Sequence, residues 1–179
     1  MPPKFAKRST ATHRRADAIE AGLRVLADLG PTTAAVQQVA AEIGVSPPYV
    51  FRLFGGKQGF FVACLDELED RVRTVFATAA TEEPFGEMGA RFREHVRDGV
   101  FSGLLVQALA AARHDEVIAA RCRSLIAGVL EEVAQTTGAT DETLAGFLAD
   151  GALVFMLQAI GADLTEGSRA AVTALRKSV

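Results

Sequence analysis

The sequence predicts an all-α protein with a small N-terminal domain and a larger C-terminal domain. About half of the 179 residues are hydrophobic (49%), and they recur at the three- and four-residue spacing that is typical of amphipathic helices. Strand signals are nearly absent, because no stretch alternates Val, Ile or Thr with polar residues between hairpin turns. A chain of this length and composition can bury a dense helical core.

The first residues are basic and lead into the first expected helix. Residues 1–9 (MPPKFAKRS) are polar and contain prolines, so we expect a flexible arm. The helix is expected to begin at Thr10 or Thr12. Arg14 and Arg15 would then lie in its first turn, where the helix dipole disfavours each positive charge by ~0.3–1 kcal/mol. A DNA phosphate backbone would offset that cost, and the arm could enter a minor groove. A merely solvated basic terminus is the alternative.

The signals of a helix-turn-helix lie in residues 36–61 (VQQVAAEIGVSPPYVFRLFGGKQGFF). Apolar residues at helical spacing give a short helix that ends at Gly44, since glycine reaches the positive φ of a helix end without strain. Ser46 is a good N-cap for a second helix, and Pro47-Pro48 fit its first turn, where a missing N–H costs little. Gly55-Gly56 ends that helix. Two short helices joined by a tight turn indicate a helix-turn-helix, whose second helix reads the DNA major groove.

The segment GVSPPYVFRLFGGKQGFF closely resembles the TetR (tetracycline repressor) family, whose turn and recognition helix read roughly G-V-S-x-x-x-l-Y-x-x-F-x-x-K-x-x-L. The tyrosine position is filled by Phe51, and a tyrosine occurs two residues earlier as Tyr49. The family's phosphate-contacting hydroxyl has therefore either moved to Tyr49 or is missing. The family's threonine at the start of the preceding helix is also missing, and Thr33 is the expected substitute cap. The matching residues are Gly44, Val45, Ser46, Phe54 and Lys57, with Phe60 in place of the usual leucine.

A set of polar and basic residues is expected to face DNA, while Val50, Leu53 and Phe54 face the core. Arg52 could reach a phosphate or a guanine edge, and Lys57 at a helix N-terminus could hold a phosphate. Prolines donate no hydrogen bond, so they can read bases only by shape or by contact with a thymine methyl group. The glutamine pair is expected in the first turn of the preceding helix. The predicted DNA-binding residues are Arg14, Arg15, Gln37, Gln38, Ser46, Pro47, Pro48, Tyr49, Arg52 and Lys57.

The distribution of charge supports this assignment although the net charge is −3. Residues 1–57 carry eight basic and four acidic side chains, a balance of +4. The remaining residues carry eleven basic and eighteen acidic side chains, a balance of −7. We therefore expect only the N-terminal part to approach a polyanion.

The resemblance implies about nine helices in two domains. We place a helix-turn-helix DNA-binding domain at residues 1–57 and an effector-binding and dimerisation domain at residues 58–179. A fourth helix over residues 56–79 would connect them, and a break is expected at Thr81-Glu82-Glu83-Pro84. In the family, ligand-driven tilting of the connecting helix changes the separation of the two DNA-reading units. The further helices are expected at about 84–98, 102–112, 115–138, 140–160 and from 168 onwards.

The family binds a small effector among its middle helices, and a similar pocket is implied here. An apolar pocket with few polar anchors would favour a hydrophobic or amphipathic ligand. Each candidate could equally be ordinary core, and the polar residues His95, Gln107 and Gln158 could face solvent or a subunit boundary. The predicted ligand-binding residues are Phe92, His95, Val96, Phe101, Leu104, Leu105, Ala108, Cys122, Ile126, Phe155 and Met156.

The helix expected at residues 140–160 is apolar nearly all round, whereas a surface helix would show a polar face. Together with the last helix it would form a four-helix dimer interface, as in the family. Without that burial, a large apolar patch would face water. The predicted dimer residues are Phe147, Gly151, Val154, Phe155, Gln158, Ala171 and Leu175.

The sequence gives little support for catalysis, and we expect no catalytic residue, metal or cofactor. No HExxH, CxxC, GxSxG or P-loop spacing occurs, and His95 with Cys122 or Glu94 lacks any repeated ligand spacing. Cys64 and Cys122 are expected to be reduced core residues. Residues 1–15 lack an apolar stretch, so no signal peptide is expected.

These observations favour a cytoplasmic, homodimeric transcriptional regulator. Its partners would be a double-stranded DNA operator and a small-molecule effector of unknown identity, with no membrane, because the longest apolar run (151–162) is too short to span a bilayer. We expect a repressor that releases its operator when the effector binds. The alternatives are a helical ligand-binding protein that does not bind DNA and a small helical enzyme.

Overall fold

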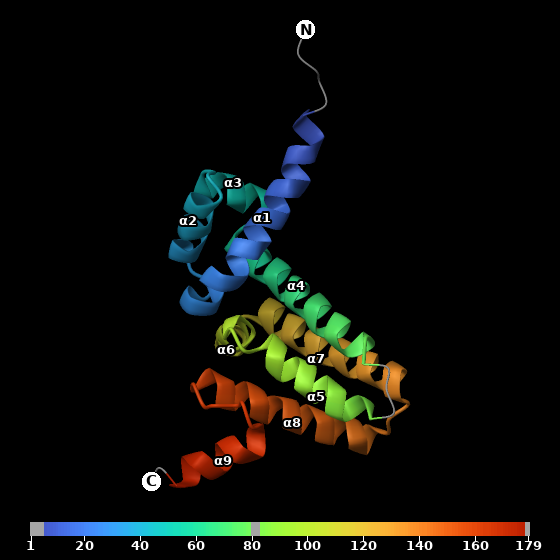
Figure 1. Ribbon diagram of the computed structural model, residues 1–179. Coiled ribbons are helices and arrows are strands. Elements are labelled where there is room, and N and C mark those ends of the chain that lie inside the picture. The colour runs from blue at the N-terminus through green and yellow to red at the C-terminus, as the bar shows by residue number, and fades with distance from the viewer. Residues whose placement is uncertain (1–5, 80–82, 178–179) are drawn as a thin grey trace.

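The structure, a computed structural model that describes residues 6–79 and 83–177, is all-α throughout that part of the chain (Figure 1). This confirms the predicted fold class. The described residues form α1 (Ala6–Leu29), α2 (Thr33–Glu42), α3 (Pro47–Phe54), α4 (Lys57–Ala77), α5 (Pro84–His95), α6 (Val100–Ala112), α7 (Glu116–Thr137), α8 (Asp141–Ala159) and α9 (Ser168–Lys177).

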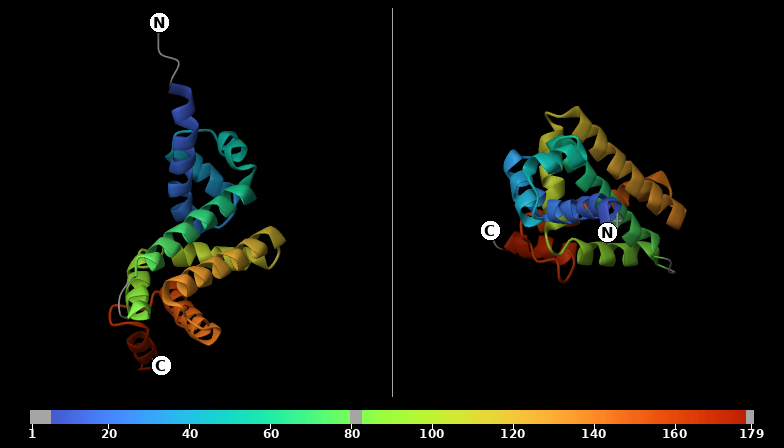
Figure 2. Two further views of the ribbon diagram at one scale, coloured as in Figure 1. Left: turned by 90° about the vertical axis from the view of Figure 1, so that its right-hand side faces the viewer. Right: turned by 90° about the horizontal axis from the view of Figure 1, so that it is seen from above.

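The helices form two units that share α4. We call α1, α2, α3 and the first turns of α4 the head, and the rest of the described chain the body. In Figure 1 α4 runs diagonally out of the head and along the body, and in the side view of Figure 2 α1 and α9 lie at opposite ends. Within α4, Phe60 and Phe61 are buried near the head, and Val72 and Phe76 are buried farther along. One continuous helix therefore carries the buried core from the head into the body.

The packing of the head against the body involves two further helices. α1 packs along α6, and α4 packs along α7. At the first contact, the Gln107 side-chain amide donates to the carbonyl oxygen of Asp28 over 3.5 Å. At the second, the Gln58 amide nitrogen lies 2.7 Å from one carboxylate oxygen of Asp115 and 2.9 Å from the other. These bonds hold the pKa of Asp115 below its ordinary value.

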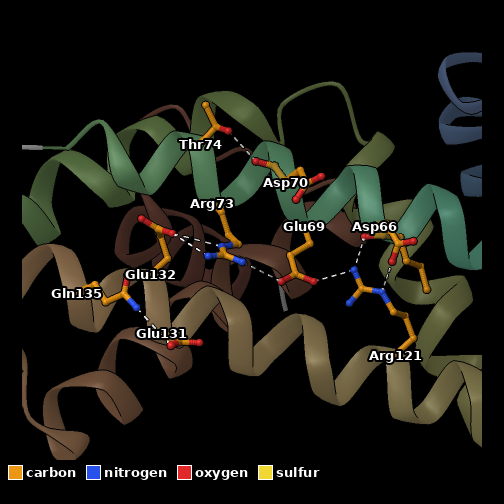
Figure 3. A network of polar contacts seen from close by, with 10 residues as sticks. Asp66, Glu69, Asp70, Arg73, Thr74, Arg121, Glu131, Glu132 and Gln135 are labelled. Atoms are coloured by element: carbon orange, nitrogen blue, oxygen red, sulfur yellow. Dashed lines mark hydrogen bonds and ion pairs between the residues drawn. The ribbon is translucent and has the colours of Figure 1, made fainter. Parts of the chain in front are cut away.

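A network of ion pairs also joins α4 to α7 (Figure 3). Glu69 lies between two arginines: its Oε2 is 2.7 Å from Nη2 of Arg121, and its Oε1 is 3.7 Å from Nη1 of Arg73. Arg121 also contacts Asp66 over 2.5 Å, and Arg73 contacts Glu132 over 3.2 Å. The side chains of Glu69 and Arg121 are only 12% and 14% exposed. Charges with so little access to water fix the α4–α7 contact, because separating them would leave one unpaired.

Most helix ends follow the expected caps, but α1 begins earlier than expected. The carboxylate of Asp115 accepts from the first N–H groups of α7, and Thr140 caps α8. α1 begins at Ala6 rather than at Thr10 or Thr12, so the end of the predicted flexible arm is helical. Good helix formers at residues 6–8 and the absence of glycine or proline after them explain the extension. Residues 1–5, and 80–82 of the expected break, lie outside the described residues.

Few residues of the last two helices are buried. In α8 only Val154 and Leu157 are buried, and in α9 only Ala171. Among the described helices, α8 is the one whose length and apolar composition alone would allow it to cross a membrane. That is weak evidence, because helices in the cores of soluble proteins meet the same criteria.

Candidate functional site

The turn between α2 and α3 has the geometry that the sequence predicts. Gly44 has a φ of +68°, and a Cβ there would meet no atom within 4 Å, so the backbone angle alone calls for glycine. The N–H of Val45 donates to the carbonyl oxygen of Ala40 over 2.9 Å and closes the end of α2. At the start of α2, the hydroxyl of Thr32 accepts a hydrogen bond from the N–H of Ala35 over 3.1 Å. The expected cap at Thr33 is therefore wrong by one residue.

Ser46 is the N-cap residue of α3, yet its hydroxyl makes no capping hydrogen bond. The two prolines explain this. A capping hydroxyl accepts from the second or third N–H of the helix, and the second position is Pro48, which has none. The third N–H, of Tyr49, donates to the carbonyl oxygen of Ser46 over 2.9 Å instead. The exposed Ser46 hydroxyl is therefore not engaged in holding the helix.

The inner face of α3 packs on the start of α4. Val50 is fully buried, and the Phe54 ring lies 4.7 Å from that of Phe60. Phe51, at the position where the resembling family has tyrosine, is half-buried against the same core. Leu53 is half-buried as well. The position of the family's tyrosine is therefore occupied here by a packing residue.

The outer face of α3 and the beginning of α4 present polar and basic side chains. Arg52 and Lys57 are exposed, and within the described residues neither forms an ion pair. Tyr49 is half-buried, Pro48 is exposed, and Pro47 is half-buried. Lys57 is the first residue of α4, next to the unsatisfied N–H groups of that helix end. Two exposed cations thus lie close to a helix N-terminus and a tyrosine.

Four other predicted DNA-binding residues lie elsewhere in their helices than expected. Arg14 and Arg15 are in the third turn of α1, since that helix begins at Ala6, so the helix-dipole argument does not apply to them. Arg14 donates to the carbonyl oxygen of Ile43 over 2.6 Å, and the Arg15 guanidinium lies 4.4 Å from the centre of the Phe54 ring. Both arginines thus tie α1 to the helix-turn-helix. The exposed pair Gln37 and Gln38 lies in the second turn of α2, not the first.

The body contains a cavity of about 830 Å³ between α4, α5, α6, α7, α8 and α9. Aromatic rings crowd one part of its wall. The Phe92 ring lies 5.2 Å from Phe101 and 5.9 Å from Phe76, and Phe147 lies 5.3 Å from Phe76 and 5.8 Å from Phe85. A cavity of this volume falls within the ~300–1,000 Å³ range of small-molecule sites.

Five of the eleven residues predicted to bind a ligand line this cavity: Phe92, Phe101, Leu105, Ile126 and Phe155. The other six do not. For five of these six the sequence signal, an apolar residue in the middle of the chain, is the same for core and for cavity. Met156 points to the outer surface of α8 and is 52% exposed, because α8 is apolar on every side and its pattern selects no inner face. The remaining residues that do not line the cavity are His95, Val96, Leu104, Ala108 and Cys122.

The polar side chains of the cavity wall are not those singled out in the sequence. Gln107 binds the end of α1, and Gln158 donates to the carbonyl oxygen of Arg97 over 3.3 Å. Arg93 is not among the predicted ligand-binding residues. Its spacing from Gly86 and Gly89 places all three on one face of α5, and this pattern in the sequence could have indicated it. The polar residues that line the cavity are Arg93, Thr143, Asp150, Ser168 and Arg169.

The groups considered for catalysis are not assembled. The His95 ring faces Phe101 at 6.4 Å, and no residue in the described part of the chain hydrogen bonds to it. Burial lowers the pKa of His95 and raises that of the Cys122 thiol, which favours the inert thiol over the thiolate. Cys64 is buried as well, and burial raises its pKa. Within the described residues, no group of three or more His, Cys, Asp or Glu side chains could hold a metal ion.

Most of the predicted dimer residues contact their own chain. Phe147, Gly151 and Phe155 line the cavity, Val154 and Ala171 are buried, and Gln158 is half-buried; of the predicted set Leu175 is exposed. The surface instead carries a group of large apolar side chains, which we call the α8–α9 apolar face. It consists of Leu148, Met156, Ile160, Val172 and Leu175, which are 38% to 65% exposed, and of these Leu148 also lines the cavity.

Comparison with known proteins supports the interpretation of the head. The family model described as "Bacterial regulatory proteins, tetR family" matches residues 18–64. The fold is similar to that of a TetR-family transcriptional regulator from Rhodococcus sp., with a TM-score of 0.65, 19% identity, and coverage of 92% of this chain and 97% of that one. It is also similar to a transcriptional regulator from Pseudomonas aeruginosa PAO1, with a TM-score of 0.59, 19% identity, and coverage of 98% and 93%. Among curated proteins, none gives a significant match.

Proposed function

We propose that this chain, whose residues 18–64 match the TetR family of bacterial regulatory proteins, is a DNA-binding transcriptional regulator rather than an enzyme. It would be a homodimeric repressor that releases its operator when a small, largely apolar effector binds. Residues 1–57 would bind DNA, and residues 58–179 would bind the effector and form the dimer. The protein would act in the cytoplasm, where it meets the chromosome.

The observation that carries the DNA-binding part of the proposal is the exposed, unpaired Lys57 at the N-terminus of α4, next to the outer face of α3. Its ammonium group and the free N–H groups of the helix end can hold a phosphate together. Tyr49 would contribute the phosphate-contacting hydroxyl, because Phe51 is packed inward and has none. Arg52, exposed on the same helix, could reach a guanine edge in the major groove.

The α8–α9 apolar face supports a dimer. Leu148, Met156 and Ile160 are separated by multiples of four residues, and such rows form the ridges along which two helices interlock. α8 and α9 from two subunits would bury one another in a four-helix interface. The dimer would then present two α3 helices to major grooves whose centres are multiples of ~34 Å apart.

The route from effector to DNA would run through α4. Val72 and Phe76 of α4 line the cavity, while Phe60 of the same helix packs against Phe54 of α3. An effector that fits the cavity better when α4 is tilted shifts the population towards a dimer whose α3 helices no longer match two grooves. The effector must therefore bind more tightly to the dimer with tilted α4 than to the dimer whose α3 helices match two grooves.

Titration of DNA from the gene's own upstream region, followed by fluorescence anisotropy at several salt concentrations, tests the DNA-binding part. Lys57→Ala should weaken binding to every sequence and reduce the slope of log K against log salt by about one, because one phosphate contact is lost. Lys177→Ala, at an exposed lysine in α9, is the matched control. An unchanged slope in Lys57→Ala would contradict the phosphate contact, and absence of any DNA binding would favour a ligand-binding protein.

A further inference from the structure

Arg93 differs from its neighbouring arginines in having no partner within the described part of the chain. Arg91, on the outer side of α5, pairs with Glu87 and donates to the hydroxyl of Thr78 over 2.6 Å. Arg97 pairs with Glu94. Arg93 lines the cavity instead, and no side chain or carbonyl oxygen of the described residues forms an ion pair or hydrogen bond with it. A guanidinium group stays charged at any physiological pH, so its need for an anion is not removed by deprotonation.

The wall around Arg93 leaves room for the guanidinium and surrounds it with apolar groups. Gly89 lies one turn earlier on the same face, and a Cβ there would lie 3.5 Å from Nη1 of Arg93. The guanidinium therefore lies back over the glycine, along the cavity wall. Arg93 is half-buried, and Phe92 and Phe101 contribute to the same wall. An ion pair formed here would be stronger than one in bulk water, because the surroundings are less polarisable.

The charge of the cavity wall also favours an anion. The charged residues that line it, within the part of the chain that the structure describes, are Arg93, Asp150 and Arg169. Asp150 and Arg169 are exposed, and Asp150 forms no ion pair with Arg93. Two positive charges therefore stand against one negative charge around a predominantly apolar space.

We propose that the effector is an amphipathic organic anion, whose carboxylate pairs with Arg93 and whose apolar body occupies the aromatic part of the cavity. The planar guanidinium presents two parallel N–H donors that match the two oxygens of a carboxylate. This assignment rests on the proposed function, since it specifies the chemical class of the effector. It excludes a neutral, purely apolar effector as the preferred ligand.

Calorimetric titration with dodecanoate and with 1-dodecanol, below their aggregation limits, tests the assignment. These probes share a chain and differ in charge, and calorimetry suits a protein that contains no tryptophan. The unmodified protein should bind dodecanoate about tenfold to a hundredfold more tightly, the effect of a hydrogen bond to a charged group. Arg93→Met should reduce that preference to about threefold or less while leaving the affinity for 1-dodecanol nearly unchanged.

Two further variants keep the test decisive. Arg93→Lys keeps the charge but loses the paired donors, so it should give a preference between those of the unmodified protein and Arg93→Met. Arg91→Met removes an arginine of the same helix that is paired outside the cavity, and it should keep the full preference. An unmodified protein that binds neither probe, or that binds both equally, would overturn the assignment. So would an Arg93→Met variant that keeps the preference.

Operator release, measured by anisotropy with the same two probes, separates this inference from the proposed function. If dodecanoate binds through Arg93 but the operator is not released, the ligand class stands and ligand-responsive repression fails. If 1-dodecanol releases the operator as well as dodecanoate does, in both the unmodified protein and Arg93→Met, ligand-responsive repression stands and the ligand class fails.

Discussion

The head and the body of this protein bury their apolar residues to different extents. Among the described residues of α1, α2 and α3, Leu29 is the one large hydrophobic side chain that is exposed. The body exposes Met156 to 52% and Ile160 to 65%, together with the rest of the α8–α9 apolar face. The two regions also differ in net charge: residues 1–57 have a balance of +4, and the remaining residues have a balance of −7.

The difference indicates what each region lacks. The head buries nearly all its large apolar side chains but carries the exposed cations Arg52 and Lys57, which have no counterion among the described residues. The body balances many of its charges internally, as the Glu69 network shows, but leaves apolar surface and a cavity unfilled. The head is thus suited to a polyanion, and the body to a second apolar surface and an apolar ligand.

The largest effect is expected from a charge placed in the α8–α9 apolar face. Met156→Glu should convert the proposed dimer to monomers, because an unpaired charge buried in an interface costs about 3–5 kcal/mol and symmetry would introduce it twice. Sedimentation velocity measures the change in mass. Val117→Glu is the matched control, since Val117 of α7 is 53% exposed and lies outside that face.

Operator affinity provides a second measurement on the same variants. Met156→Glu should lose most of its operator affinity without any change to the head, because a monomer presents a single α3 helix. A Met156→Glu protein that stays dimeric would mean that the exposed apolar face serves another purpose.

The close packing of the head can be broken at Gly59. A Cβ at this position would lie 2.0 Å from the carbonyl oxygen of Phe54, and a backbone atom cannot easily move aside. Gly59→Ala should therefore destabilise the protein by about 1–3 kcal/mol or more, measured by denaturant unfolding. In the body, Gly86 of α5 has room, with the nearest atom 4.0 Å away, so Gly86→Ala should be neutral or stabilise by up to about 1 kcal/mol. Equal losses of unfolding free energy in Gly59→Ala and Gly86→Ala would contradict the difference in packing.

The ion-pair network between α4 and α7, within the body, can be tested at Glu69. Glu69→Gln removes the charge that two arginines share in a nearly buried position, and should cost about 1–3 kcal/mol of stability. The control is Glu116→Gln, because Glu116 and Arg123 form an ion pair on α7 whose side chains are 81% and 65% exposed. Such exposed pairs contribute about 0–1 kcal/mol. Chemical unfolding of both variants measures the difference, and similar losses would show that the α4–α7 network is no stronger than a surface pair.

The head could be predicted more fully than the body, because its signals are local. Gly44 and the Ser46-Pro47-Pro48 sequence fix the turn through their own backbone preferences. Errors there are small, such as the cap at Thr32 instead of the adjacent Thr33. α1 begins before the expected caps at Thr10 and Thr12 because residues 6–8 are good helix formers and no glycine or proline follows them.

The cavity depends on how α5, α6, α7 and α8 cross, and the residue pattern of a single helix does not contain that information. Leu104 and Leu105 illustrate the problem, since both are apolar neighbours in α6, yet one is in the core and the other lines the cavity. Met156 was assigned to the wrong side for a related reason, because α8 is apolar all round. Arg93 could have been predicted from the sequence, because a charged residue on the same helix face as glycines and phenylalanines is an unusual combination.

The smallest expected effect concerns acid stability, and it separates a half-buried histidine of the body from an exposed one of the head. Burial lowers the pKa of His95 below 6.5; the nearby Arg71 acts in the same direction, and Asp98 opposes it. Below pH 6.5 the unfolded chain therefore binds a proton on His95 before the folded chain does, so stability falls as the pH drops through that range. The melting temperature of the unmodified protein should then decrease more between about pH 7.5 and 5.5 than that of His95→Gln. The same substitution at the exposed His13 of α1 is the control, and an equal decrease in the unmodified protein and His95→Gln would show that burial of His95 has no part in the acid response.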